Sequence, residues 1–539
     1  MAEWLHRASR RRTAEIAVVC GFVAAKLLVH FIFNRGYGYF RDELYYLACG
    51  QHLAWGYVDQ PPLIALAARF SRIAFGDSLP SIRVLPALAG GLKVAIAGLL
   101  ARQLGGRLWA MAMAMAASLA ALAYLGIDNL LSMNAFEPLF WMGCAYFLVR
   151  IINGTSGRPE RPGRPPFRPG AAGTTWLWFG VMAGLGLENK HSMAFFGLGL
   201  IAGLLLTPLR REFARKWIWL GALVALAIAL PNLVWEARHH WATYELLSNI
   251  AHSGKNVVNS PAEFLRQQVL IMNPATFPLW LGGLGWLLLA REGKRYRVLA
   301  VAYLVTLLEL IVLHGKHYYL APAYGMLFAA GGVAVEHWAG LQSITPRRFA
   351  VPAVGSFVFV MLAAAALCAP TTMPILAPER VPAWMKAIHL TPPPTETAHT
   401  AALPQVLADQ FGWPEMVAQV ARVYQSLPAG DRERAAIFGS NYGEAAAVDF
   451  FGPRYRLPPA ISGHQSYFLW GPRGFNGDVV IVLDTPSDSN CHEFASVQDF
   501  GRLQLSPWAM PWERQTHIYV CRGLKIPVSE LWPRVKMWI

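Results

Sequence analysis

The sequence predicts an α-helical polytopic membrane protein that carries a C-terminal extracytoplasmic α/β domain. Of its 539 residues, 55% are hydrophobic and only 15% are charged, which is rare in a soluble protein. Apolar runs long enough to cross a bilayer, about 20 residues each, recur through the first two thirds of the chain. Such segments must satisfy their own backbone hydrogen bonds in lipid, which favours helices. After residue 370 the composition becomes that of a soluble protein.

The apolar runs predict eleven membrane spans. These spans cover residues 13–33, 84–104, 108–126, 134–150, 174–188, 192–208, 217–235, 274–290, 298–313, 318–336 and 349–369. The basic N-terminus, Met1 to Arg12, leads directly into the first span without a small-residue cleavage site, so we expect an uncleaved span.

The positive charges predict the orientation of the spans. Every connection on the side of the N-terminus carries at least two cations, whereas the opposite connections mix acids, histidines and aromatics. This asymmetry places the N-terminus in the cytoplasm and, with eleven spans, the C-terminus outside. The Pro/Gly/Arg-rich stretch 154–170 is predicted to be a disordered cytoplasmic loop. The net charge of +15 therefore has an orienting role and does not call for nucleic acid as a partner.

The change in composition predicts two domains, a transmembrane catalytic domain over 1–369 and an extracytoplasmic α/β domain over 370–539. In the second domain, strand-like runs at Ala435–Phe438, Val479–Leu483 and His517–Val520 alternate with helical patterns.

Two cysteines, Cys491 and Cys521, lie together in the second domain. An oxidising compartment permits a disulfide between them, and we expect one.

The first outer loop, 34–83, is expected to hold interfacial helices and contains Asp42 and Glu43 beside Arg41. A carboxylate just after a span is suited to take the proton from an acceptor hydroxyl, so Asp42 is a candidate base with Glu43 or Arg41 to orient it. The alternative is an acid pair that caps a helix or faces lipid headgroups.

Further along this loop, Asp59 precedes Pro61 and Pro62. An acid on such a stiff turn is a candidate ligand for a divalent metal or a sugar hydroxyl. It is equally expected as the N-cap of a helix that starts at Pro61.

Two further acids, Asp128 and Glu137, are predicted to face one outer cavity and to bind the sugar or the acceptor. Lys26, Lys93 and Glu309 lie inside predicted spans, where a charge is costly, and are expected to pair with neighbouring groups.

Two other outer turns supply cations and aromatic rings. Their candidate residues are Lys190, His191, Lys316 and His317 for the donor phosphate, and Tyr318 and Tyr319 for stacking on a sugar. Taken alone, each turn is equally typical of boundary residues that reach toward the membrane surface.

The convergence of acids and cations on outer turns favours a polyprenyl-phosphate-linked sugar as the donor. Its leaving phosphate gains charge in the transition state and needs cations or a metal, while the acceptor hydroxyl needs a base. No Gly-rich nucleotide cradle motif occurs in the sequence. The acceptor is left open between a protein, a lipid and a glycan.

The order R-D-E-L-Y-Y (41–46), D-Q-P-P-L (59–63) and R-V-L-P-A-L-A-G (83–90) resembles bacterial members of the protein mannosyltransferase and aminoarabinose transferase superfamily. The resemblance covers about residues 13–340 and implies an inverting glycosyltransferase of GT-C fold in the bacterial inner membrane, facing the periplasm. It implies that Asp42 is the base, with Glu43 beside it, and that Asp59 can help to hold a metal. The aminoarabinose transferases carry a phosphate-contacting lysine before the two prolines, where this chain has Gln60, so either Lys190 or Lys316 takes that role or the donor differs.

Two other functions are compatible with the pattern. A flippase for a lipid-linked sugar would share the charged outer cavity, but it predicts polar residues and broken helices near the midplane of the membrane. A structural membrane subunit leaves the recurrent acids and cations unexplained.

Overall fold

The computed structural model describes the chain except for residues 1, 156–170, 343–347, 393, 395 and 487–490. The described chain forms two compact units. The first, here the membrane unit, comprises Met1–Asn34, Arg83–Leu233 and Val258–Ile375; the second, here the sheet unit, comprises Arg35–Ile82, Val234–Val257 and Leu376–Ile539. Most of the predicted cytoplasmic loop 154–170, namely residues 156–170, lies outside the described residues.

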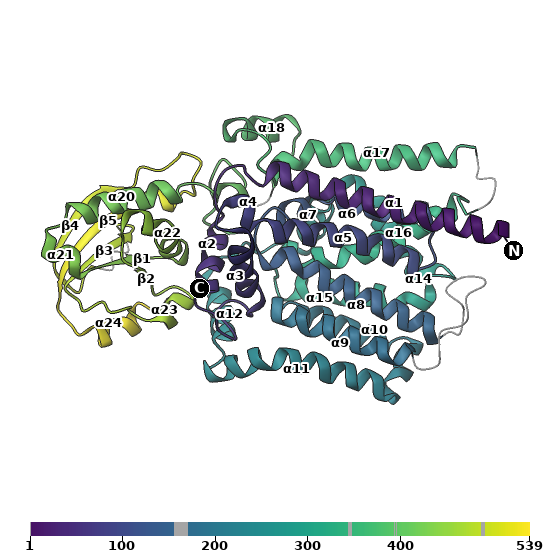
Figure 1. Cartoon of the computed structure of the whole chain (residues 1–539), viewed down its shortest axis with the longest axis horizontal. Helices are drawn as coiled ribbons and strands as arrows, with labels where there is room; N and C mark the ends of the chain where they lie inside the picture. Colours follow the sequence, from purple (N-terminus) through teal and green to yellow (C-terminus); the bar gives the residue numbers. More distant parts are fainter. Residues whose placement is uncertain (1, 156–170, 343–347, 393, 395, 487–490) are drawn as a thin grey trace. The chain divides into compact units, whose positions relative to one another are not determined.

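Helices make up the membrane unit and overlap the predicted spans, apart from one helix over residues 261–271 (Figure 1). They are α1 (Ala2–Phe33), α5 (Val84–Gln103), α6 (Leu108–Ala120), α7 (Leu122–Ile127), α8 (Met133–Thr155), α9 (Ala171–Asn189), α10 (Met193–Leu205), α11 (Lys216–Arg238), α13 (Pro261–Ile271), α14 (Phe277–Leu289), α15 (Arg297–Val312), α16 (Tyr324–Trp338) and α17 (Ala350–Cys368). Short 3-10 helices join them, among which η4 (His317–Ala323) carries predicted site residues.

Length and hydropathy qualify six helices of the described chain as membrane spans, or seven if the bent pair Met193–Leu205 and Pro208–Ala214 is one span. The protein is thus a multi-pass membrane protein. The eleven spans and the placement of the two termini stay predictions. The predicted span 108–126 is divided into α6 and α7 by extended backbone at Ala121, where ψ is 118°.

Small residues allow the helices of the membrane unit to approach closely. A Cβ atom on Gly180 of α9 would lie 2.1 Å from the carbonyl oxygen of Gly221 on α11. A Cβ atom on Gly331 of α16 would lie 2.1 Å from the carbonyl oxygen of Leu279 on α14. This small-residue packing is typical of helices in lipid, where apolar burial alone does not drive association.

The sheet unit combines two loop segments with the C-terminal part of the chain. The segment 35–82 forms the short helices α2 (Arg41–Gln51), α3 (Leu63–Phe75) and α4 (Leu79–Ile82), as predicted for the first outer loop. The other helices are α12 (Ala242–Ser253), α18 (Val381–Ala387), α19 (Gln405–Ala408), α20 (Trp413–Ser426), α21 (Ala429–Arg434), α22 (Tyr442–Phe451), α23 (Ser466–Trp470) and α24 (Val528–Arg534).

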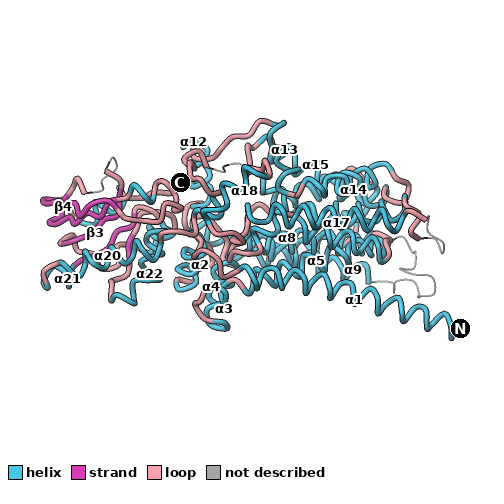
Figure 2. Tube along the Cα trace, turned by 90° about the horizontal axis from the view of Figure 1, so that it is seen from above, coloured by secondary structure: helices cyan, strands magenta, loops and turns pink. Residues whose placement is uncertain are grey.

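The strands of the sheet unit, coloured magenta in Figure 2, form one sheet, in which their order is β2-β1-β3-β5-β4. β1 (Ala435–Gly439), β3 (Val479–Asp484) and β5 (His517–Leu524) confirm the three predicted strands. The sequence did not predict β2 (Ala460–Ile461), which has only two residues, or β4 (Phe494–Arg502). β4 is an edge strand exposed along most of its length, so it lacks the apolar run that marks a buried strand.

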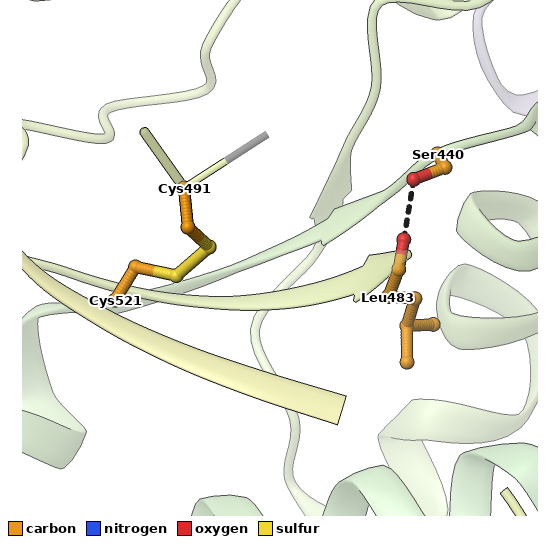
Figure 3. Close-up of a disulfide and its surroundings, with 4 residues drawn as sticks. All are labelled: Ser440, Leu483, Cys491 and Cys521. Atoms are coloured by element: carbon orange, nitrogen blue, oxygen red, sulfur yellow. Dashed lines mark hydrogen bonds between the residues drawn. A yellow bond between two sulfur atoms is a disulfide. The ribbon is translucent and has the colours of Figure 1, made fainter. Parts of the chain in front are cut away.

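The structure contains the disulfide expected between Cys491 and Cys521, whose Cα atoms lie 6.0 Å apart (Figure 3). Cys521 lies on β5, and Cys491 lies shortly before β4 in the chain. Beside it, Ser440 donates a hydrogen bond to the carbonyl oxygen of Leu483, which fixes the end of β1 to its neighbour β3.

Candidate functional site

The predicted acid pair lies in the first turn of α2, in the sheet unit. Glu43 is fully buried, and its Oε2 accepts a hydrogen bond of 2.9 Å from the backbone N–H of Phe40. Glu43 therefore caps the start of α2. For this residue, the alternative interpretation of the acid pair as a helix cap is correct. Asp42 does not share this contact, and its side chain is 29% exposed.

Arg41 lies among three carboxylates. Its guanidinium is 3.7 Å from Asp42, 3.8 Å from Glu396 and 3.8 Å from Asp409. Burial raises the pKa of Asp409 to about 7, against the opposing effect of Arg41. The single guanidinium of Arg41 thus lies beside three carboxyl groups, and that of Asp409 ionises at a higher pH than an ordinary aspartate.

Asp42 is anchored through one oxygen. Oδ1 accepts a hydrogen bond of 2.7 Å from the hydroxyl of Tyr442, a residue 400 positions away at the start of α22. The nitrogen Nε of Arg41 approaches the same oxygen. Within the described residues, Oδ2 of Asp42 forms no hydrogen bond or ion pair. Asp42 thus combines a fixed side chain with an uncommitted, partly exposed carboxylate oxygen.

Asp59 also lies in the sheet unit and accepts a hydrogen bond of 2.8 Å from the hydroxyl of Tyr45. The same hydroxyl accepts a hydrogen bond from the backbone N–H of Ser466. Burial raises the pKa of Asp59 to about 7. The prediction that Asp59 caps a helix from Pro61 is wrong, because α3 starts at Leu63 with Pro62 as its N-cap and has no side-chain cap.

A metal site at Asp59 is not supported by a preformed set of ligands. Within the described residues there is no group of three or more His, Cys, Asp or Glu side chains placed to hold a metal ion. One oxygen of Asp59 is already occupied by Tyr45. Gln60, at the position where relatives carry lysine, is fully buried and donates to the sulfur of Cys49.

In the membrane unit, the structure joins Glu137 and Lys190, which the sequence assigned to different turns. The ammonium of Lys190 lies 3.0 Å from Oε2 of Glu137 and donates to Oδ1 of Asn134 at 2.8 Å. It also lies 4.3 Å from the ring centroid of Tyr319 and 5.9 Å from that of Tyr318. Four of the predicted residues therefore form one cluster, which has a single lysine and two aromatic rings.

The other predicted cations make separate contacts. His191 pairs through Nε2 with Oδ1 of Asn232 at 3.0 Å. His317 is buried at the start of η4, where its carbonyl oxygen accepts a hydrogen bond from Gln268. Lys316 directly precedes η4, and hence Tyr318 and Tyr319.

Asp128 is fully buried between two lysines rather than exposed to an outer cavity. Its Oδ2 lies 2.9 Å from Lys26, and its Oδ1 contacts Lys93. Both lysines are 1% exposed, which confirms that these charges pair inside the protein. The expectation that Asp128 and Glu137 share a cavity is not met, since each is engaged by different lysines.

The sequence did not single out Tyr442, Asp409 or Glu396. All three follow residue 370 in the chain, and no local motif connects them to Asp42.

Comparison with known proteins bears on this arrangement. The family described as dolichyl-phosphate-mannose-protein mannosyltransferase matches residues 59–160 and 170–235. A lipid A galacturonosyltransferase, RgtD of Rhizobium johnstonii, is 26% identical over 280 residues. That alignment covers 50% of this chain and 55% of the relative, so the chain spans about half the length of this curated relative.

Solved structures match nearly the whole chain. ArnT from Cupriavidus metallidurans matches in its apo state with a TM-score of 0.57 and 15% identity, over 93% of this chain and 97% of ArnT. The chain thus shares the fold of ArnT over nearly its whole length. The ArnT structure bound to undecaprenyl phosphate matches over the same shares with a TM-score of 0.56 and 14% identity. A mycobacterial arabinofuranosyltransferase, AftD, matches 94% of this chain over 40% of its own length, with a TM-score of 0.51 and 14% identity.

Proposed function

We propose that the chain is an inverting membrane glycosyltransferase that moves a sugar from a polyprenyl-phosphate donor to a hydroxyl acceptor. The reaction takes place at the outer face of the bacterial inner membrane. The named relatives support this class: RgtD is a lipid A galacturonosyltransferase, and one ArnT structure holds undecaprenyl phosphate. The sugar and the acceptor are not assigned.

The single observation that carries the proposal is the state of Asp42. Tyr442 and Arg41 both approach Oδ1, whereas Oδ2 has no partner in the described chain and the side chain is 29% exposed. A general base needs a fixed carboxylate with one oxygen open to the proton that it abstracts. Glu43 lacks this freedom because it caps α2, so the base is assigned to Asp42 alone.

The proposed transfer is a displacement at the anomeric carbon of the donor sugar. The acceptor O–H proton moves to Oδ2 of Asp42, and the acceptor oxygen forms a bond to the anomeric carbon. The bond between that carbon and the phosphate oxygen breaks, and its electron pair leaves with the polyprenyl phosphate. One displacement with one base inverts the anomeric configuration.

The donor phosphate is assigned to Lys190, with Lys316 as a further cation and the histidines His191 and His317 as hydrogen-bond donors. Lys190 is held by Glu137 and Asn134 and faces the ring of Tyr319. A fixed ammonium stabilises the charge that develops on a leaving phosphate. Tyr318 and Tyr319 are then suited to stack on the sugar or the isoprenoid.

No step is assigned to a metal, because the described residues around Asp59 do not form a metal-binding group. Asp59 is proposed to bind a hydroxyl of the sugar or the acceptor. A carboxyl group with a pKa of about 7 can either donate a hydrogen bond to such a hydroxyl or accept one from it. Turnover in excess chelator tests whether a divalent ion is needed.

The proposal is tested with purified wild type and Asp42→Asn in liposomes that contain a panel of polyprenyl-phosphate sugars. A crude envelope extract serves as the acceptor, and released polyprenyl phosphate is measured. Release by wild type and its loss in Asp42→Asn support the assignment. If no donor releases polyprenyl phosphate while labelled carrier crosses the bilayer, the protein is a flippase and the proposal is wrong.

A further inference from the structure

The geometry points to Tyr442, in the C-terminal part of the chain, as the positioning residue that holds the base Asp42. The inference rests on the proposed function. It gives the C-terminal α/β segment a part in catalysis, because that segment supplies the contact that orients the carboxylate of α2.

The Tyr442 hydroxyl is the closest partner of Asp42. It donates to Oδ1 at 2.7 Å, whereas Nε of Arg41 lies 3.7 Å from the same oxygen. Arg41 is also shared with Glu396 and Asp409, at 3.8 Å each. The phenol is therefore the group that selects one Asp42 rotamer and leaves Oδ2 for the acceptor.

The ring of Tyr442 is itself fixed from several sides within the sheet unit. Its centroid lies 4.7 Å from that of Tyr45 and 4.9 Å from that of His464, and the Arg41 guanidinium lies 5.4 Å from it. Its backbone N–H donates to Nδ1 of His464 at 3.3 Å. A side chain held in this way can position its neighbour without large loss of entropy at the moment of reaction.

The backbone around Tyr442 adds a second constraint. Tyr442 is the first residue of α22, and Asn441 caps the helix by accepting from the N–H groups of Gly443 and Glu444. At Gly443 an added Cβ would lie 2.6 Å from Cγ of Arg41 and 2.9 Å from the ring of Trp413. The start of α22 thus packs directly on α2, beside Asp42.

The test compares Tyr442→Phe with the matched control Tyr467→Phe in the full-length protein. Tyr467 is also a buried tyrosine of the sheet unit that donates to an arginine-paired aspartate, Asp449, at 2.8 Å. We expect Tyr442→Phe to lower kcat about 10- to 100-fold, the effect of losing a hydrogen bond to a charged group. The donor KM should change less than about twofold, because only the reacting geometry is disturbed. Tyr467→Phe should keep kcat within about twofold of wild type.

The pH profile gives a readout that a structural role would not move. A hydrogen bond donated to a carboxylate favours its ionised form, so Tyr442→Phe should move the acidic limb of kcat against pH to higher pH. A ring-fluorinated tyrosine at position 442, a stronger donor of the same shape, should move this limb to lower pH and serves if Tyr442→Phe does not fold.

The outcomes separate the inference from the proposed function. Wild-type kcat in Tyr442→Phe, or parallel losses of kcat and melting temperature in both tyrosine variants, overturns the inference while the transferase assignment stands. Full activity of Asp42→Asn instead overturns the base assignment, and the positioning role falls with it. If the wild-type protein releases no polyprenyl phosphate with any donor, both the inference and the proposed function are wrong.

Discussion

Replacement of Asp128 by asparagine should destabilise the membrane unit strongly. The carboxylate is fully buried and is the ion-pair partner of two lysines, Lys26 and Lys93, which are each 1% exposed. The site has no spare room: a Cβ on Gly90 would lie 2.7 Å from Oδ2 of Asp128 and 2.9 Å from Cε of Lys26. The two ammonium groups could not move to water without displacing packed helices.

The magnitude follows from the loss of a buried counter-charge. Removal of one partner from a buried ion pair costs about 3–5 kcal/mol, because the remaining charge is left without compensation. In a domain of this size the cost corresponds to a fall of about 5–15 °C in melting temperature. Replacement of the whole triad by apolar residues, Lys26→Met, Lys93→Met and Asp128→Leu, should recover most of the loss, since no buried charge then remains.

The assay is the melting temperature of purified protein in nanodiscs, followed by intrinsic fluorescence. Asp77→Asn is the matched control, because Asp77 is 53% exposed and pairs with Arg72 at the surface, where such a pair contributes about 0–1 kcal/mol. An Asp128→Asn protein that melts within about 1 °C of wild type would refute the reasoning, as would a triple variant less stable than Asp128→Asn.

Two further predictions concern the site. Lys190→Met should raise the donor KM about 10-fold or more, because the substitution removes the phosphate cation but keeps the apolar stem. The KM is measured from initial rates of polyprenyl phosphate release against donor concentration, and an unchanged KM would move phosphate binding elsewhere. Asp409 should make the protein less stable as pH rises, since burial raises its pKa from 3.8 to about 7 and the folded state holds a proton that the unfolded chain has lost. This contribution to stability is fully present below about pH 4 and is lost as the pH rises through about 7. The melting temperature of Asp409→Asn should therefore fall less between pH 5 and 8 than that of wild type. An equal fall in both proteins would contradict the assignment.

Local patterns in the sequence predicted the positions of most long helices and buried strands. Apolar runs predicted where the long helices lie, because each helix in lipid must be apolar along its own length. Short apolar runs predicted the strands β1, β3 and β5. The sequence did not predict β4, because an exposed edge strand needs no apolar pattern.

The partners within the site depended on tertiary contacts that no local pattern encodes. Asp42 and Glu43 look alike in sequence, and only the hydrogen bond from Phe40 to Glu43 and the contact of Tyr442 with Asp42 separate their roles. Likewise, Lys190 and Glu137 are 53 residues apart and meet because α8 packs on α9. The segment 35–82 also joins the C-terminal part of the chain in one compact unit, although the sequence assigned it to the membrane domain.

The most direct test of the central claim is the rate of polyprenyl phosphate release by Asp42→Asn relative to wild type, with Asp77→Asn as the control in the same loop segment. Loss of a general base predicts a fall of about 100- to 10,000-fold for Asp42→Asn, with the rate of Asp77→Asn unchanged. Equal rates for wild type and Asp42→Asn would contradict the assignment of Asp42 as the base.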